Sequence, residues 1–261
     1  ATAVLHATVP MEEKKQVAEI ALCAIIVIKK KNNQAKFKVM FTENQKLEDL
    51  LKINTQLILM LPRFKMDLGF GDKKVQEVCK ERNIPTSMFL AICNVYTFDH
   101  YTPSPKEIQE IDENILIEYL QISHDYYLNQ RLTHIKKHIE KIADNAGKIG
   151  DVLKEFFSNY SHEMEKHFQM EEMRLFKKSS DKHDVDEQFI FEEVEESHAT
   201  ICDHLKDLTN IIVKYLPPTL MTNERISVWF DLTQLNEDLR KHTDIEDKIL
   251  LPYLKLKKQK A

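Results

Sequence analysis

The chain has 261 residues, of which 43% are hydrophobic and 30% charged, and its formal net charge is −5. This length suits one large domain or two modest ones, and the hydrophobic share is sufficient for a packed core. The charge argues against the basic surface with which nucleic-acid-binding proteins contact phosphates. Only 4 Gly and 8 Pro interrupt the chain, which indicates a largely helical protein.

Residues 1–39 have no clear place in the expected fold. They are predicted either as two short strands around a polar turn or as an irregular extension. Met40 precedes a helix start near Thr42 and looks like a natural beginning of the fold. We therefore expect residues 1–39 to be an N-terminal extension that adds nothing to function.

The same region contains the longest apolar run, residues 20–28, which is far shorter than the roughly 20 residues that span a bilayer. No small-residue cleavage site follows it, so we expect neither export nor a membrane partner. The cysteines form no CxxC pair, and we expect reduced thiols in a cytoplasmic protein. These cysteines are Cys23, Cys79, Cys93 and Cys202.

Residues 40–99 are predicted to form a small helical domain. Three segments with apolar residues at helical spacing are separated by breaks at residues 68–71 and 83–86. Residues 100–113 contain two prolines and several polar residues, so they are predicted to be a linker.

From residue 114 onward the pattern changes to long amphipathic helices with short polar connections. Four long helices joined by short turns are typical of an up-down-up-down bundle. The sequence therefore predicts an all-α protein in which a four-helix bundle over residues 114–255 follows the small domain. The helices are expected over residues 114–144, 149–179, 185–215 and 222–250.

Two of these helices repeat one arrangement, a histidine followed four residues later by a glutamate. Residues four apart lie on one helix face, so the histidine and the glutamate of each pair can both bind the same metal ion. The other two helices each place one histidine among apolar residues. The six candidate metal ligands are His124, His167, Glu171, His198, His242 and Glu246.

The order and spacing of these six residues favour a shared metal site. A lone histidine on an apolar face is usually a core residue, and a single HxxxE motif is common by chance. Here His167 follows His124 by 43 positions and His242 follows His198 by 44, so the two halves look alike. A buried carboxylate without a partner is costly, and four histidines with two carboxylates suit a pair of bridged iron ions.

The residues around these ligands resemble the hemerythrin-like cation-binding family, and more closely its RIC (repair of iron centres) proteins. That resemblance implies two non-haem iron ions per chain with a bridging oxo or hydroxo group. It further implies carboxylate bridges from Glu171 and Glu246. The resemblance rests on residues 61–71, 75–79, 123–132, 167–176, 196–199 and 242–252.

The same resemblance implies how the four histidines are shared. One iron would be bound by His124 and His167. The other iron would be bound by His198 and His242.

This chain departs from both groups of proteins at one point each. Many RIC proteins carry a Cys pair where this chain has Gly69 and Phe70, which removes the basis for thiol chemistry in the small domain. Oxygen-carrying hemerythrins have a fifth histidine one turn after the third, where this chain has Cys202. Cys202 is either a thiolate ligand or a small apolar filler.

Other polar residues lie close to the predicted ligands in sequence. Glu163 and Glu195 each lie about one turn before a predicted histidine ligand, and they either form an acidic path for iron or protons or belong to the solvated surface. Tyr127 and Tyr160 are candidate hydrogen-bond donors near the site. Arg131 either neutralises a carboxylate of the site or extends to the surface.

The predicted ligand set leaves each iron an open or water-filled position, at which dioxygen or nitric oxide could bind. Resemblance to RIC proteins implies repair of iron-sulfur clusters damaged by nitrosative or oxidative stress, with iron-sulfur apo-proteins as partners. The alternative is a di-iron sensor of oxygen, nitric oxide or redox state. The missing fifth histidine argues against reversible oxygen binding. The sequence decides neither whether the protein is an enzyme nor its oligomeric state.

Overall fold

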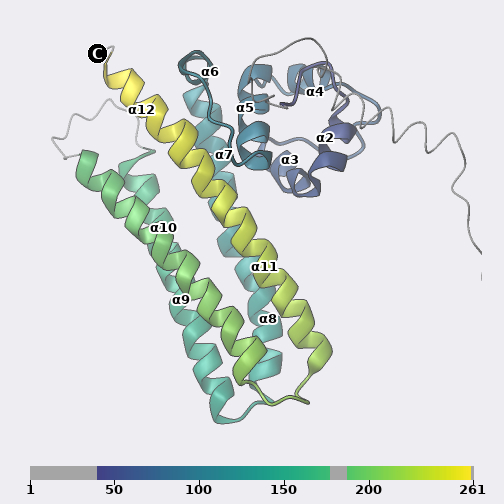
Figure 1. The fold of residues 1–261 in the computed structure, drawn as a ribbon, viewed down its shortest axis with the longest axis vertical. Coiled ribbons are helices and arrows are strands. Elements are labelled where there is room, and N and C mark those ends of the chain that lie inside the picture. The colour runs from purple at the N-terminus through teal and green to yellow at the C-terminus, as the bar shows by residue number, and fades with distance from the viewer. Residues whose placement is uncertain (1–39, 177–186, 260–261) are drawn as a thin grey trace, which may run out of the picture. The chain divides into compact units, whose positions relative to one another are not determined.

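The computed structural model describes residues 40–176 and 187–259, and the predictions made for residues 1–39 lie outside them. Residues 41–261 form one compact unit. The described residues contain helices and no strands, which confirms the all-α prediction (Figure 1). None of the described helices combines the length and the apolar character that crossing a bilayer requires.

The small helical unit, residues 41–97, consists of short helices joined by tight turns. The side chain of Asn54 caps a 3-10 helix by accepting a hydrogen bond from the backbone of Gln56. The predicted break at residues 68–71 is present, because Gly69 and Gly71 both have positive φ, a conformation that glycine adopts without strain. The helices are α2 (Leu47–Ile53), η1 (Thr55–Leu59), α3 (Met60–Arg63), α4 (Val75–Glu81) and α5 (Thr86–Thr97).

The predicted linker contains a short helix that the sequence analysis missed, α6 (Pro105–Gln109). Ser104 and Glu107 form a capping box at its start, and Pro105 stands in its first turn. This combination is a known helix start, so the signal was present in the sequence. The helix contacts α5 and the last helix of the chain.

Four long helical segments form the bundle, close to the predicted boundaries (Figure 1). The fourth is longer than expected. Pro252 would disrupt a regular α-helix, but a π-helical turn precedes it and the helix continues beyond it. The segments are α7 (Glu113–Asp125) with η2 (Tyr126–Arg131) and α8 (Leu132–Ala143); α9 (Lys148–Arg174); α10 (Glu187–Asn210) with η3 (Ile211–Tyr215); and α11 (Thr222–Ile245) with η4 (Glu246–Leu250) and α12 (Leu251–Lys258).

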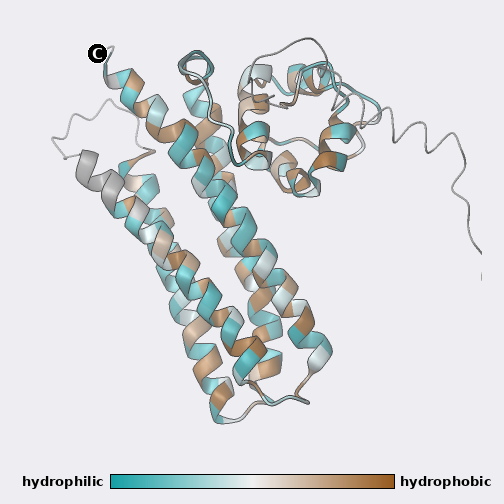
Figure 2. Ribbon diagram, in the orientation of Figure 1, coloured by the Kyte–Doolittle hydropathy of each residue, from teal (hydrophilic) through white to brown (hydrophobic). Residues whose placement is uncertain are grey.

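The buried apolar side chains form two separate clusters. The first joins the small helical unit to one end of the bundle and includes Leu120, Val194 and Ile245. The second fills the rest of the bundle and includes Tyr127 and Ile201. Figure 2 shows the hydrophobic and hydrophilic residues interspersed along the long helices, as amphipathic packing requires. Each long segment passes from one cluster to the other, and the candidate ligands lie at that boundary.

Candidate metal centre

The structure brings all six predicted ligands together inside the bundle. Each of the four segments contributes one histidine, and the second and fourth also contribute a glutamate. All six side chains are buried, and Glu171 and Glu246 are 0% exposed. Their ligand atoms form two groups, and within each group all atoms lie within 4.8 Å of one another. The first ligand group is His124, Glu171, His242 and Glu246, and the second ligand group is His167, Glu171 and His198.

Glu171 belongs to both ligand groups and faces histidines of each. Its Oε1 atom lies 3.1 Å from His167 Nε2 and 3.2 Å from His198 Nε2. Its Oε2 atom lies 3.4 Å from His124 Nε2. Because its two oxygens face different groups, this carboxylate is placed to bridge two metal ions.

Glu246 has a similar position on the fourth segment. Its Oε1 atom lies 3.2 Å from Nε2 of His242, a member of the first ligand group. Its Oε2 atom lies 3.3 Å from Nε2 of His198, a member of the second. The two glutamates therefore reach the space between the two ligand groups from two different segments, Glu171 from α9 and Glu246 from η4.

The histidines pair differently from the expectation based on family resemblance. His124 Nε2 lies 3.1 Å from His242 Nε2. The rings of His167 and His198 meet edge to face, with centroids 4.8 Å apart. These contacts group the histidines differently from the expected pairs, His124 with His167 and His198 with His242, and the sharing of the histidines between two ions stays a prediction. At this level of the bundle the first segment faces the fourth, and the second faces the third.

Two π-helical turns adjoin the site. The turn η2 begins two residues after His124, and the turn η4 begins at Glu246 itself. A π-helical turn contains one extra residue, so it changes the direction of the side chains that follow, and such turns are frequent at functional sites. Neither turn was predicted from the sequence.

His124 is held in the form that a metal ion requires. Its Nδ1 atom lies 2.9 Å from Oε1 of Glu172, to which a protonated Nδ1 donates. Burial lowers the pKa of His124, which favours the neutral ring. With the proton on Nδ1, the lone pair of Nε2 points toward the cluster. Glu172 was not predicted from the sequence, although it directly follows the predicted ligand Glu171.

The charges of the other ligands depend on one another. Burial opposes ionisation of Glu246, but the nearby imidazoles of His242 and His198 hold its pKa well below the ordinary value. The imidazoles of His167 and His198 likewise outweigh burial and lower the pKa of Glu171. Burial acts against a charged His198, yet its close contacts with the two glutamates raise its pKa to about 10.

Several buried polar atoms of the cluster lack a hydrogen-bond partner among the described residues. Histidine nitrogens lie within ion-pair distance of the glutamate oxygens, but most of these contacts lack hydrogen-bond geometry. An unpaired buried polar atom costs about 1–3 kcal/mol, so a cation beside the unpaired glutamate oxygens would be strongly favoured. The histidines face these oxygens through Nε2, and their unpaired Nδ1 atoms are not part of this argument. The atoms are His167 Nδ1, Glu171 Oε2, His198 Nδ1, His242 Nδ1, Glu246 Oε1 and Glu246 Oε2.

Tyr127 and Cys202 both lie beside the ligands, but neither completes the ligand set. The Tyr127 ring meets His242 edge to face at 5.6 Å, while its hydroxyl donates to the backbone oxygen of Asp238 at 3.3 Å. Cys202 lines a small apolar pocket with His198 and other residues, and it belongs to neither ligand group. Burial raises the pKa of Cys202, which favours the protonated filler over a thiolate ligand.

The remaining polar residues predicted near the site are not shown to contact the six ligands. Glu163 pairs with His204, 2.5 Å from its Nδ1, and both side chains are partly exposed. Arg131 contacts Asp231 at 3.2 Å and no carboxylate of the cluster. The Tyr160 hydroxyl is buried and has no hydrogen-bond partner in the part of the chain that the structure describes. The side chain of Glu195 lies outside the described residues.

The model of the hemerythrin HHE cation-binding domain family matches residues 116–254, which is more than half of the chain. This range includes all six residues of the two ligand groups. Comparison with curated proteins and with solved structures gave no match. The closer likeness to RIC proteins therefore stays a prediction.

Proposed function

Because this chain belongs to the hemerythrin HHE cation-binding family, we propose that its buried cluster binds two iron ions. One ion would be held by His124 and His242, and the other by His167 and His198. Glu171 and Glu246 would bridge the ions together with an oxo or hydroxo group. The position of Glu171, whose two oxygens face different ligand groups, is the observation that carries this proposal.

The ligand set suits iron on chemical grounds. Imidazole nitrogens and carboxylate oxygens are typical ligands of non-haem iron. Two imidazoles, two carboxylate oxygens and one bridging oxygen would give each ion five ligands, which would leave one position for a small molecule. When bound, the two ions would supply redox change and binding of dioxygen or nitric oxide.

The proposed role is repair of iron-sulfur clusters damaged by nitrosative or oxidative stress. The protein would donate iron to apo-proteins that have lost their clusters, or remove nitric oxide from them. Protein residues would hold the ions in a buried site, and Glu172 would keep His124 in its binding form. The support for this role is the ligand arrangement together with the sequence resemblance to RIC proteins.

A sensor of oxygen, nitric oxide or redox state is the second candidate. A buried ion pair between Arg63 of the small helical unit and Asp238 of α11 favours it. Asp238 lies one turn before His242, so a change at the metal centre has a short physical route to the small unit.

The metal proposal is tested by loading the purified chain with ferrous iron and measuring bound iron together with the visible absorption spectrum. We expect two irons per chain and an absorption band from the bridging oxygen. The variant Glu171→Ala should lose the band and at least one iron. Glu165→Ala, an exposed glutamate on the same helix, is the matched control and should behave as the parent protein. A Glu171→Ala variant that keeps both irons and the band would contradict the proposal.

The two roles are separated by a second pair of measurements on the iron-loaded protein. Transfer of iron to an apo-ferredoxin, or consumption of nitric oxide over several turnovers, supports repair. A ligand-dependent change in the small helical unit without turnover supports sensing. An iron-loaded protein that shows neither behaviour would contradict both roles while leaving the metal site intact.

A further inference from the structure

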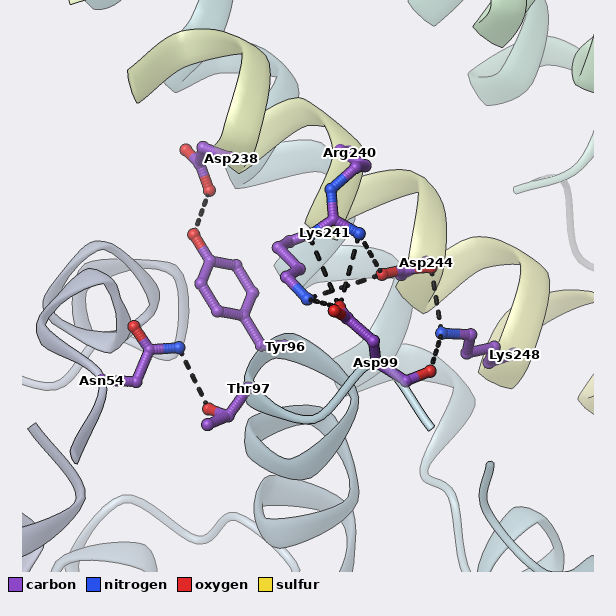
Figure 3. Close-up of polar contacts among 9 residues, drawn as sticks. All are labelled: Asn54, Tyr96, Thr97, Asp99, Asp238, Arg240, Lys241, Asp244 and Lys248. Carbon is purple, nitrogen blue, oxygen red and sulfur yellow. Dashed lines mark hydrogen bonds and ion pairs between the residues drawn. The ribbon is translucent and has the colours of Figure 1, made fainter. Parts of the chain in front are cut away.

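Asp238 is the centre of a buried polar cluster that joins the small helical unit to the bundle. Nη1 and Nη2 of Arg63 donate to its two carboxylate oxygens at 3.1 and 2.5 Å. The hydroxyl of Tyr96 donates to Oδ1 of the same carboxylate at 2.5 Å (Figure 3). Arg63 belongs to α3 and Tyr96 to α5, so two helices of the small unit hold one residue of α11.

All three members of this cluster are removed from solvent. The side chains of Arg63 and Asp238 are each 2% exposed, and Tyr96 is 0% exposed. Burial and the charge of Asp238 raise the pKa of Tyr96, so its hydroxyl keeps the proton that it donates. If one partner of a buried ion pair leaves, the other stays buried and unpaired, which is strongly unfavourable. The small unit therefore holds α11 in one position.

Arg63 also contacts the first segment of the bundle. Its guanidinium lies over the rings of Tyr126 and Tyr127, 5.3 and 5.1 Å from their centroids. Both tyrosines belong to η2, the π-helical turn that follows His124. A cation over an aromatic ring is attracted to it, and a buried contact of this kind is stronger than an exposed one.

Two short routes therefore connect Arg63 to the first ligand group. The route through Asp238 reaches His242, which follows one turn later on α11. The route through Tyr127 reaches the same histidine, because the Tyr127 ring meets the His242 ring at 5.6 Å.

We infer that Asp238 is a positioning residue for His242, and that metal binding and the docking of the small helical unit stabilise each other through Arg63 and Asp238. This inference rests on the proposed metal site. Metal bound between His124 and His242 would fix α7 and α11 relative to each other, which fixes the surface that Arg63 occupies. Coupling between two sites is reciprocal, so loss of the ion pair would also weaken metal binding.

The inference is tested by hydrogen exchange of the full chain with and without bound iron. In the parent protein, we expect loading to slow exchange in α3 and α5 by roughly 5-fold to 150-fold, the usual range of coupling between two sites. The double variant Arg63→Met and Asp238→Leu replaces both charges by apolar groups, so it leaves no buried charge unpaired. It should still bind iron, more weakly, and its exchange in α3 and α5 should no longer respond to loading.

Two further variants keep the test decisive. Tyr96→Phe removes one hydrogen bond to Asp238 and keeps the ring, so it should fold and show a reduced response. Asp99→Asn disrupts the partly exposed contacts with Lys241 and Arg240 at the same interface, and it should respond as the parent protein does (Figure 3).

The outcomes are separable from those of the metal proposal. Iron that binds the parent protein without slowing exchange in α3 and α5 would overturn the coupling while leaving the metal site in place. An unchanged response in both the double variant and Tyr96→Phe would overturn the assigned route. A parent protein that binds no iron would overturn the metal site and the coupling together.

Discussion

The protein contains two buried polar clusters that differ in how completely their atoms are paired. Among the described residues, only Nε of Arg63 lacks a hydrogen-bond partner in the cluster of Arg63, Asp238 and Tyr96. In the cluster of the two ligand groups, three carboxylate oxygens lack one within the same residues. Both lie inside the same compact unit, so the difference does not come from exposure. The first cluster is completed by the protein itself, whereas the second has the composition and the unpaired atoms of a site that a cation completes.

The largest effect is expected from breaking the paired cluster. Asp238→Ala leaves Arg63 buried without its counter-charge, so it should lower the free energy of unfolding of the metal-free protein by about 3–5 kcal/mol. Chemical denaturation of the metal-free protein measures this loss. The double variant Arg63→Met and Asp238→Leu is the control and should lose much less, because neither charge remains. A loss of under about 1 kcal/mol for Asp238→Ala would contradict a buried pair.

A smaller effect is expected at the edge of the ligand cluster. Glu172→Gln weakens the hydrogen bond that fixes the His124 ring, so iron affinity should fall by roughly 10-fold to 100-fold, as for other residues that orient a metal ligand. Competition with a chelator gives the affinity. Glu165→Gln, on the same helix and exposed, should leave the affinity unchanged. Equal affinities for Glu172→Gln and the parent protein would show that His124 does not bind metal in this orientation.

The charge of His198 leads to a pH dependence of metal binding. Because its pKa in the metal-free protein is raised to about 10, this ring carries a proton at pH 7 that a metal ion must displace. Loading at pH 7 should release one proton from His198, and affinity should rise about tenfold per pH unit between pH 7 and 9. Calorimetric titration in buffers of different ionisation enthalpy counts the protons. Loading without proton release would contradict the pairing of His198 with the two glutamates.

The same proton affects the metal-free fold in the opposite direction. The folded pKa of His198 lies above its unfolded value of about 6.5. Its contribution to stability is therefore fully present below about pH 6.5 and is lost as the pH rises toward 10. Denaturation of the metal-free protein at pH 6 and pH 10 should show this decrease.

The smallest effect is expected at the rim of the interface between the small unit and α11. Asp99 contacts Lys241 at 2.7 Å; the Lys241 side chain is 6% exposed, but that of Asp99 is 63% exposed. Asp99→Asn should change the free energy of unfolding by less than about 1 kcal/mol, because solvent screens the Asp99 charge and Lys241 keeps Asp244 at 3.8 Å. Denaturation in the same series as Asp238→Ala gives the comparison directly. If Asp99→Asn lowered the free energy of unfolding as much as Asp238→Ala does, the difference in exposure between the two contacts would not explain their contributions to stability.

Much of the bundle could be predicted because its signals are local. Amphipathic periodicity located the four long segments. The repeated HxxxE pattern named four residues, and two histidines among apolar residues completed the six that the structure brings together. The pairing of the histidines could not be predicted from spacing, because it depends on which segments face each other at one level. The helix end at residue 250 was wrong because a π-helical turn allows the helix to continue through Pro252.

The cluster of Arg63, Tyr96 and Asp238 could not be predicted from local sequence patterns. Asp238 is a buried charged residue one turn before a predicted ligand, and it was not predicted from the sequence. Its partner Arg63 is 175 positions away in the chain, and no periodicity connects them. Burial of a charge pair between distant segments depends on the packed structure, so it became visible only there.

The most direct test of the metal centre is a crystal structure of the iron-loaded protein with anomalous scattering measured at the iron absorption edge. Two peaks are expected inside the bundle, one beside His124 and His242 and one beside His167 and His198, with Glu171 and Glu246 adjacent to both. A single peak, or iron bound only outside these six residues, would contradict the account.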